Sequence, residues 1–347
     1  MDNRTSPDPR GSQAVGQIWT RLLSGRYTAI WIATIALFAI SPLIAPGSLG
    51  SAPLLSMLPF AAVLAIASVG QTLVVQQRGL DLSVPGMLAL GAVLVTKLPQ
   101  SYGWDVVPAV IVGVAVPLLF GLLNGVIVVV FKVMPLVVTL GMNSVLLGVV
   151  FMISGGTPSS APTQLYQFTL DRTFGIPNTL LIAIVVIIIA GFVASRTVIG
   201  RRLTEVGVSE PAARAIGTPV VSYQVLAYGV AGAFYAAAGI LLASYTKTPP
   251  LFLGDSYLLP TVAAVVLGGT ALTGGLASIV ASGVAALFLT QLGQLFRAVG
   301  WSDAWQLIAQ AVVLMLVVLI REIVPMIRRS MTERRRSRGP AAVSAAS

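Results

Sequence analysis

The sequence predicts an all-α, polytopic membrane protein with about ten transmembrane helices. Three observations lead to this fold class: an apolar composition, ten long apolar runs, and an uneven distribution of Lys and Arg. Of the 347 residues, 56% are hydrophobic and 9% are charged, and the mean hydropathy is +0.92. Because a soluble domain has about 25% charged residues, this chain cannot cover itself with a solvated surface, and its apolar excess has to face lipid.

The apolar runs define the predicted elements in order. A helix needs about 20 apolar residues to cross a bilayer, and most of the runs reach that length. The predicted spans are 27–46, 54–76, 83–97, 106–131, 134–154, 176–195, 223–246, 256–272, 276–296 and 304–324. They form one membrane domain, 27–324, between a polar N-terminal segment, 1–26, and a basic C-terminal tail, 325–347.

The third predicted span is short and follows a break in the apolar pattern. It begins near Pro85, directly after Arg78, Gly79 and Asp81. Irregular backbone at membrane depth is tolerated only where protein or a wet cavity satisfies its polar groups. We therefore expect a broken helix at this position, packed inside the protein.

Lys and Arg set the predicted orientation. If the N-terminus is cytoplasmic and the spans alternate, seventeen of the 21 Lys and Arg residues lie on the cytoplasmic side. The other four, which lie outside, are Lys97, Arg172, Lys247 and Arg297. Because cytoplasmic loops are enriched in these residues, we expect a plasma-membrane protein with both termini in the cytoplasm. We interpret the arginine-rich tail as an anchor near anionic lipid rather than a nucleic-acid arm.

The chain contains no Cys and no His. This removes disulfides, thiolate chemistry, the usual zinc sites and a His general base. The chain also lacks the Gly-x-x-x-x-Gly-Lys-Ser/Thr phosphate loop, so we do not expect it to hydrolyse ATP. We predict no catalytic residue, no metal site and no cofactor, and therefore a protein that is not itself an enzyme.

The longest polar loop between spans is 196–222, on the predicted cytoplasmic side. Ser209 is suited to cap a helix N-terminus, and Gly217 can end that helix in a left-handed conformation. The sequence thus predicts a helix of one or two turns between two glycines. The residues of this predicted helix and its ends are Gly207, Ser209, Glu210, Ala212, Ala213, Arg214 and Gly217. Such a segment either docks in a cleft of another protein or is a solvated loop.

Five polar residues lie within or beside apolar runs: Asp81, Ser83, Asn124, Thr139 and Asn143. An ionisable group inside a bilayer is a candidate functional residue, so Asp81 could line a solute path or anchor the broken helix. Alternatively, Asp81 lies at the cytoplasmic interface, paired with Arg78 or capping the next helix through Ser83. The uncharged side chains could bind a hydroxylated solute, or could link helices, as polar residues in membranes commonly do.

Four glycine-containing motifs occur in a distinctive order. They are the segment 78–86, the segments 121–125 and 135–142 taken together, the loop segment 200–217, and the glycine-rich turn 267–275. In this order they resemble the ribose/xylose-type ABC permease family, and the resemblance covers residues 55–320. Arg78 and Pro85 stand where that family usually has glycine, and Glu205, Ser209 and Ala277 also depart from its pattern.

The resemblance implies a permease subunit of an ATP-driven ABC importer for a monosaccharide or a similar small polar solute. A second permease copy or a paralogue would complete the path. A separate ABC ATPase would bind the 196–222 coupling loop, and an extracytoplasmic sugar-binding protein would deliver the solute. The outer residues Lys97, Arg172, Lys247 and Arg297 could then pair with acidic residues of that binding protein, or be ordinary loop charges.

Other functions compete with this expectation. An ion-coupled secondary transporter or channel would need paired ionisable groups inside the bilayer, and the sequence shows no such pair. Within the ABC permeases, branched-chain amino acids or nucleosides are alternative solutes, because their permeases contain looser forms of the same motifs.

Overall fold

The computed structural model describes residues 27–302, 304–312, 315 and 319. Within these residues the chain is helical apart from its turns, irregular segments and one small hairpin, β1 (Arg172–Thr173) and β2 (Ile176–Pro177). The predicted segments 1–26 and 325–347, and much of the last predicted span, 304–324, lie outside the described residues.

Six helices of the described chain are long and apolar enough to cross a membrane. They are α3 (Ser51–Gln76), α5 (Val106–Val129), α6 (Pro135–Ser154), α8 (Asn178–Arg196), α11 (Val220–Thr246) and α13 (Ile279–Ala298). Each overlaps one predicted span and begins or ends within a few residues of it. The protein is therefore a mostly helical, multi-pass membrane protein, whereas the predicted count of ten spans is not confirmed.

Three further helices overlap predicted spans but do not meet the same criteria: α2 (Thr28–Ile44), α4 (Val84–Tyr102) and α12 (Leu258–Leu267). α12 is preceded by a single 3-10 turn, η1 (Asp255–Tyr257). The predicted span 256–272 is only partly helical because α12 ends at Gly268 and Gly269 adopts φ +94°. That backbone conformation is open to glycine but incompatible with a continuing right-handed helix.

Three short helices lie outside the predicted spans: α7 (Thr163–Leu170), α9 (Val198–Val208) and α10 (Glu210–Ala215). Only α10 was predicted. Thr197 is the N-cap of α9, and its side chain accepts a hydrogen bond from the Gly200 N–H. Leu203 and Val206 of α9 are buried, whereas Arg201 and Arg202 are exposed. One apolar face of α9 thus packs on the protein. The sequence analysis did not predict this helix, because its segment is rich in charged residues.

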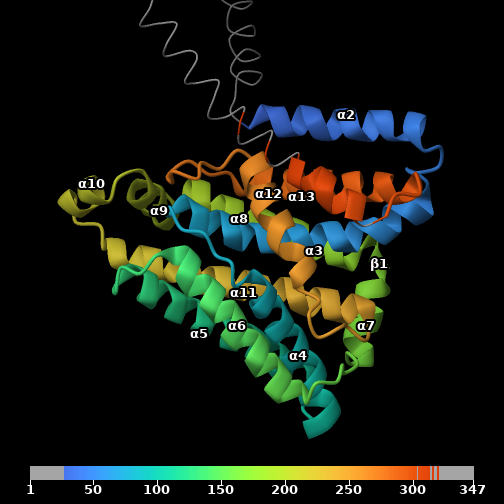
Figure 1. Ribbon diagram of the computed structural model, residues 1–347, viewed down its shortest axis with the longest axis horizontal. Coiled ribbons are helices and arrows are strands. Elements are labelled where there is room, and N and C mark those ends of the chain that lie inside the picture. The colour runs from blue at the N-terminus through green and yellow to red at the C-terminus, as the bar shows by residue number, and fades with distance from the viewer. Residues whose placement is uncertain (1–26, 303, 313–314, 316–318, 320–347) are drawn as a thin grey trace, which may run out of the picture.

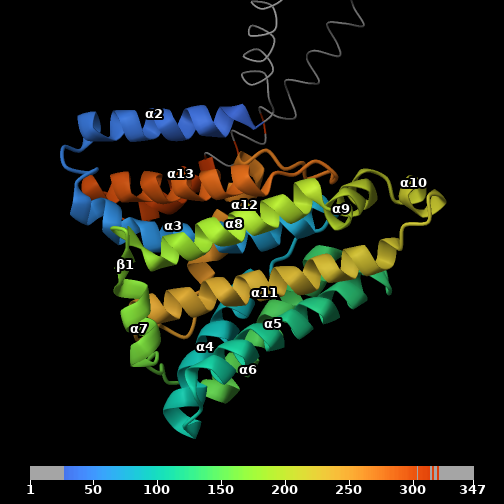
Figure 2. The ribbon, with the colours of Figure 1, turned by 180° about the vertical axis from the view of Figure 1, so that it is seen from behind.

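α11 runs through the middle of the molecule and packs against α3, α4 and α5 (Figures 1 and 2). Glycines permit this close packing. A Cβ at Gly121 would lie 2.4 Å from Tyr228 O, and one at Gly232 would lie 2.5 Å from Pro117 O. Small residues let helix backbones approach in membranes, where van der Waals contact replaces the hydrophobic effect as the driving force. α3 and α11 therefore form the buried centre of the described chain.

The two ends of the molecule differ. α9 and α10 lie at one end, and α7 with the β hairpin lies at the opposite end (Figures 1 and 2). α10 projects beyond the neighbouring ends of α8 and α11, whereas the long helices run between the two ends. The candidate sites described below are therefore separated along the long direction of the bundle.

Candidate coupling helix, buried polar segment and cavity

The structure confirms the predicted short helix in the 196–222 loop. Ser209 Oγ accepts a hydrogen bond from the Ala212 N–H at 3.4 Å, as expected of an N-cap. At the other end Gly217 has φ +80°, and the Thr218 N–H donates to Ala213 O at 2.9 Å. Local residue chemistry therefore determines both ends of α10.

α10 is anchored on one side and exposed on the other. Ala213 is buried against Val206 and Val220, whereas Ala212, Arg214 and Ile216 are exposed. Ile216 is 69% exposed, although it is a large apolar side chain. An apolar residue beside an arginine on a projecting helix is a surface of the kind that packs against a partner protein.

Glu210 connects α10 to the membrane helices. Its Oε1 accepts a hydrogen bond from Gln224 Nε2 of α11 at 2.7 Å. Its Oε2 lies 3.9 Å from Arg214 Nη2, and this is the one ion pair among the described residues. The Arg214 side chain is 59% exposed, so its guanidinium is available to a partner.

α9 is held tightly against the end of α3 and the glycine-rich turn. Gln76 Nε2 donates to Thr204 Oγ1 at 3.0 Å and to Gly275 O at 3.1 Å, and the Gly275 N–H donates back to Gln76 O at 2.9 Å. A Cβ at Gly207 would lie only 2.2 Å from Gln76 O. Gly207 is therefore required for close approach. The sequence analysis did not place the glycine-rich turn beside this loop.

Asp81 lies in the irregular segment 77–83 between α3 and α4 and is fully buried. Its Oδ1 accepts hydrogen bonds from the backbone N–H of Ser83 at 2.9 Å and from Ser83 Oγ. The alternative in which Asp81 pairs with Arg78 is wrong, because the Arg78 guanidinium donates to Gly207 O and Val208 O. The hydrogen bonds to Ser83, which is the N-cap residue of α4, agree with the alternative in which Asp81 caps the next helix through Ser83, and they also anchor the broken helix.

The uncharged polar residues connect that broken helix to its neighbours. Asn124 Nδ2 donates to Ser83 Oγ at 3.0 Å, and Thr139 Oγ1 accepts from the Leu82 N–H at 3.0 Å. Asn143 Oδ1 accepts from the Gly86 N–H at 2.8 Å. These contacts are the hydrogen bonds expected if the uncharged polar side chains link helices, rather than bind solute.

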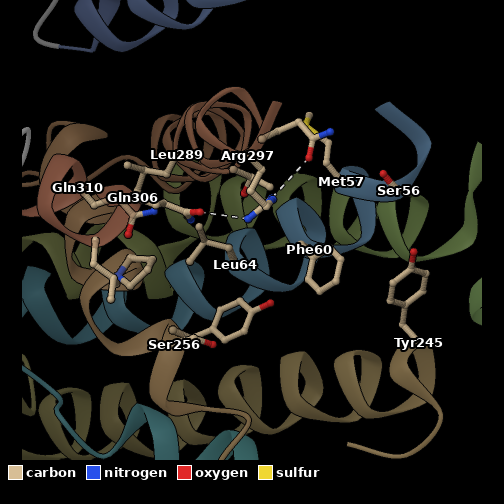
Figure 3. Close-up of a pocket in the computed structure, with 15 residues that line it drawn as sticks. Ser56, Met57, Phe60, Leu64, Tyr245, Ser256, Leu289, Arg297, Gln306 and Gln310 are labelled. Atoms are coloured by element: carbon tan, nitrogen blue, oxygen red, sulfur yellow. Dashed lines mark hydrogen bonds between the residues drawn. The ribbon is translucent and has the colours of Figure 1, made fainter. Parts of the chain in front are cut away.

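A cavity of about 640 Å³ lies between α3, the end of α11, α12 and α13 (Figure 3). Arg297 Nη1 donates to Gln306 Oε1 at 3.1 Å, and Nη2 donates to Gln294 Oε1 at 3.5 Å. Other polar lining residues are Ser56, Tyr245, Ser256, Tyr257, Thr290 and Gln310. Hydroxyl and carboxamide groups of this kind can bind a hydroxylated solute.

The solute-path residues expected from the sequence do not line this cavity, and their role in transport stays a prediction. Conversely, sequence reasoning missed the glutamines of the lining and considered Arg297 only as an outer charge. Amide side chains within apolar runs, at 294, 306 and 310, were the signal that could have indicated the cavity.

Lys97, Arg172 and Lys247 belong to the end of the molecule opposite to α10. Lys97 Nζ donates to Ser154 O at 3.3 Å, and Lys247 Nζ lies 5.2 Å from the centre of the Tyr166 ring. Arg172 is exposed in the hairpin. Three of the four predicted docking residues, including Arg297 in the cavity, therefore have local contacts, and docking itself stays a prediction.

A bundle of long apolar helices, with a partly open cavity of mixed polar and apolar lining and a projecting helix at one end (Figure 1), fits the class of multi-pass membrane permeases. Residues 54–318 match the family described as branched-chain amino acid transport system / permease component. The chain belongs to this family, and within it to the permeases of sugar ABC transporters.

Its relatives include several import permeases. The ribose import permease protein of Escherichia coli (strain K12) is 32% identical over 317 residues, which are 87% of this chain and 98% of that protein. The ribose import permease protein of Bacillus subtilis (strain 168) is 31% identical, with 79% and 86% covered. The fructose import permease protein of Bifidobacterium longum (strain NCC 2705) is 30% identical, with 69% of each chain covered. No solved structure matches the chain.

Proposed function

We propose that this chain is the transmembrane permease subunit of an ATP-driven ABC importer for a monosaccharide or a similar small polar solute. The observation that carries the proposal is the projecting helix α10, which is capped at both ends, anchored by Ala213 and Glu210, and exposed around Arg214. In a family of import permeases, this helix has the form expected of a contact for a separate motor protein.

The ATPase partner would bind α10 from the cytoplasm. In this proposal the end of the molecule that carries α10 faces the cytoplasm, in accordance with the positive-inside distribution of Lys and Arg. Both chain termini would lie on the same side. The chain would work as a pair, with a second copy or a paralogue, and both would receive ATP-driven movement through their α10 helices.

Two observations support a sugar as the solute. The relatives are named for import of ribose and fructose, and the lining of the 640 Å³ cavity contains three glutamines, two tyrosines and one arginine. An extracytoplasmic binding protein would deliver the sugar to the opposite end, where Lys97, Arg172, Lys247 and Arg297 are candidates for docking. Branched-chain amino acids remain the second candidate because the family description names them.

Reconstitution tests the proposal. The chain, an ABC ATPase and a binding protein from the same source organism are placed in liposomes, and uptake of radiolabelled ribose, fructose, leucine and a nucleoside is measured. We expect the uptake of a sugar. This uptake should require the binding protein, and it should require ATP on the side of the membrane that carries the ATPase. Uptake by the chain alone, driven by an ion gradient, would instead identify a secondary transporter. ATP-dependent uptake of leucine, without uptake of any sugar, would identify a branched-chain amino acid as the solute.

A further inference from the structure

Arg78 has an unusual backbone position for a charged residue. It follows α3 with φ 64°, in the left-handed region that favours glycine. Its N–H donates to Val75 O at 2.9 Å, and the Gly79 N–H donates to Val74 O at 3.1 Å. These are the two hydrogen bonds of a Schellman helix end, in which glycine is the usual residue at this position. The backbone geometry alone therefore does not explain an arginine.

The Arg78 side chain binds the end of a different helix. Its Nε donates to Gly207 O at 3.1 Å, and its Nη2 donates to Val208 O. Both carbonyls lie in the last turn of α9, where backbone C=O groups lack partners within the helix and the helix dipole favours a cation. Arg78 therefore joins the end of α3 to a helix end 129 positions further along the chain.

The same side chain packs on the glycine-rich turn between α12 and α13. A Cβ at Gly274 would lie 2.4 Å from Arg78 Cγ, so a side chain at Gly274 would displace the arginine. Three parts of the molecule thus meet at one residue. They are the irregular segment 77–83, the pair of helices α9 and α10, and the turn 268–278.

A movement of α10 can be passed to Arg78 through few intervening residues. Only Ser209 separates α9 from α10, so a displacement of α10 also displaces the carbonyls that Arg78 binds. Neighbouring contacts act in the same direction, because Gln77 Nε2 donates to Leu203 O of α9 at 2.8 Å. On the other side of Arg78, three residues along the chain, lies the buried Asp81.

We infer that Arg78 is a positioning residue for transport, which passes movement of the α9–α10 pair to the segment 77–83 and to the turn 268–278. This inference rests on the proposed function, in which an ATPase binds α10. Arg78 contacts neither solute nor nucleotide in this role. It fixes the distance between the helix that receives the movement and the irregular backbone that has to change.

Arg78→Gly separates this role from a purely structural one. Glycine suits a backbone with φ 64° better than arginine does, so the helix end is preserved while the guanidinium is lost. We expect normal assembly with the ATPase and normal ATP hydrolysis, but at least a fivefold fall in the number of solute molecules imported per ATP. An arginine with a purely structural role would leave this ratio unchanged.

Lys132→Gly is a matched control. Lys132 also has a left-handed backbone, with φ 57°, and lines the same cavity of about 360 Å³ as Arg78, but its side chain has no hydrogen bond in the described structure. This variant should keep the wild-type ratio of uptake to ATP hydrolysis. An equal fall in Lys132→Gly and Arg78→Gly would overturn the inference, because loss of any cation at this end would then suffice.

The outcomes distinguish this inference from the proposed function. If the wild type shows ATP-dependent uptake and Arg78→Gly keeps the same ratio, the inference is wrong and the proposed function stands. If the wild type takes up solute without an ATPase, the proposed function itself is wrong. If Arg78→Gly does not assemble, Arg78→Lys, which keeps the charge but not the two-point contact, is judged by the same ratio.

Discussion

Buried side chains connect the membrane helices through individual hydrogen bonds. Asn124 donates to Ser83, and Tyr235 Oη donates to Gln71 Oε1 at 2.6 Å. All four residues are buried. Such bonds in membranes contribute about 0.6 to 2 kcal/mol each, because the unfolded chain in the bilayer also finds partners. Each bond is therefore a modest but measurable contribution to the position of the broken helix.

Asn124→Ala tests whether this side chain links helices or binds solute. Removal of the Nδ2 group breaks the bond to Ser83, so we expect the protein to lose about 1 kcal/mol of stability while the KM for uptake is unchanged. The thermal unfolding midpoint in detergent and the uptake kinetics are measured on the same preparation.

Ser144→Ala is the control, because exposed Ser144 bonds only to Leu140 O of its own helix. A raised KM with an unchanged unfolding midpoint in Asn124→Ala would place Asn124 in the solute path instead.

Whether the role of a single residue could be predicted from the sequence depends on how close in the chain its contacts lie. The roles of Ser209 and Gly217 were predicted because a helix cap depends on residues within one turn. The partners of Arg78 were not predicted, because its side chain bonds to carbonyls more than a hundred residues away. The contact between Asp81 and Ser83 spans only two residues, and it was one of the alternatives considered for Asp81.

Among the elements, α10 shows how a six-residue helix can be stable. An isolated helix of that length does not form in water, because its nucleation is unfavourable. Here Ser209 closes its N-terminus, Glu210 bonds to α11, and Ala213 is buried. These contacts leave Arg214 and Ile216 exposed without loss of the helix, so the exposed face can vary with the partner.

Charge reversal at Arg214 tests this face. We expect Arg214→Glu to lower ATP-dependent uptake at least tenfold, equivalent to about 1.4 kcal/mol, because it replaces an exposed guanidinium with a carboxylate at the proposed ATPase contact. The ATPase retained by the purified permease and the uptake rate are measured together. Arg202→Glu, at an exposed position of α9, is the control and should have a smaller effect. Equal transport in wild type and Arg214→Glu would show that α10 is not the coupling contact.

The elements were predicted well where hydrophobicity alone determines them. The runs behind α3, α5 and α6 are long and apolar, and helices are found there. α12 is shorter than its apolar run because Gly268 and Gly269 end it, and hydrophobicity does not report that break. α9 was missed because its short amphipathic pattern lies within a sequence rich in arginine.

On the scale of the whole molecule, the described Lys and Arg residues are divided between two ends. Arg78, Lys132 and Arg214 line one cavity at the α10 end, whereas Lys97 and Lys247 are bonded near the ends of helices at the opposite side. This division agrees with the alternation used to predict the orientation. The side of the membrane that each end faces stays a prediction.

Single cysteines can test the orientation because the natural chain has none. Ala212→Cys lies on α10, and Phe174→Cys lies in the hairpin turn, where Phe174 is 95% exposed. We expect a membrane-impermeant maleimide added to intact spheroplasts to label Phe174→Cys and not Ala212→Cys. Inverted vesicles should give the opposite result, and labelling of Ala212→Cys from outside would reverse the proposed orientation.

Docking of the binding protein is a prediction about the opposite end. Replacement of Arg172 and Lys247 together by Glu should weaken binding of that protein to permease vesicles at low salt, where charges act over about 30 Å. The difference should shrink at high salt because exposed charges are then screened. Unchanged affinity at low salt would show that these are ordinary loop charges. Arg172→Glu alone would show how much of the effect comes from Arg172, because Lys247 also contacts the Tyr166 ring.

The glycine contacts along α11 have a consequence for how the molecule can move. Where backbone touches backbone, as at Gly121 and Gly232, one helix cannot slide along its neighbour without separating from it at several points at once. α5 and α11 are therefore expected to turn together as one stiff block. We therefore expect a change of shape between the two faces of the membrane to concentrate in irregular stretches that connect helices, such as 77–83, 247–254 and 268–278.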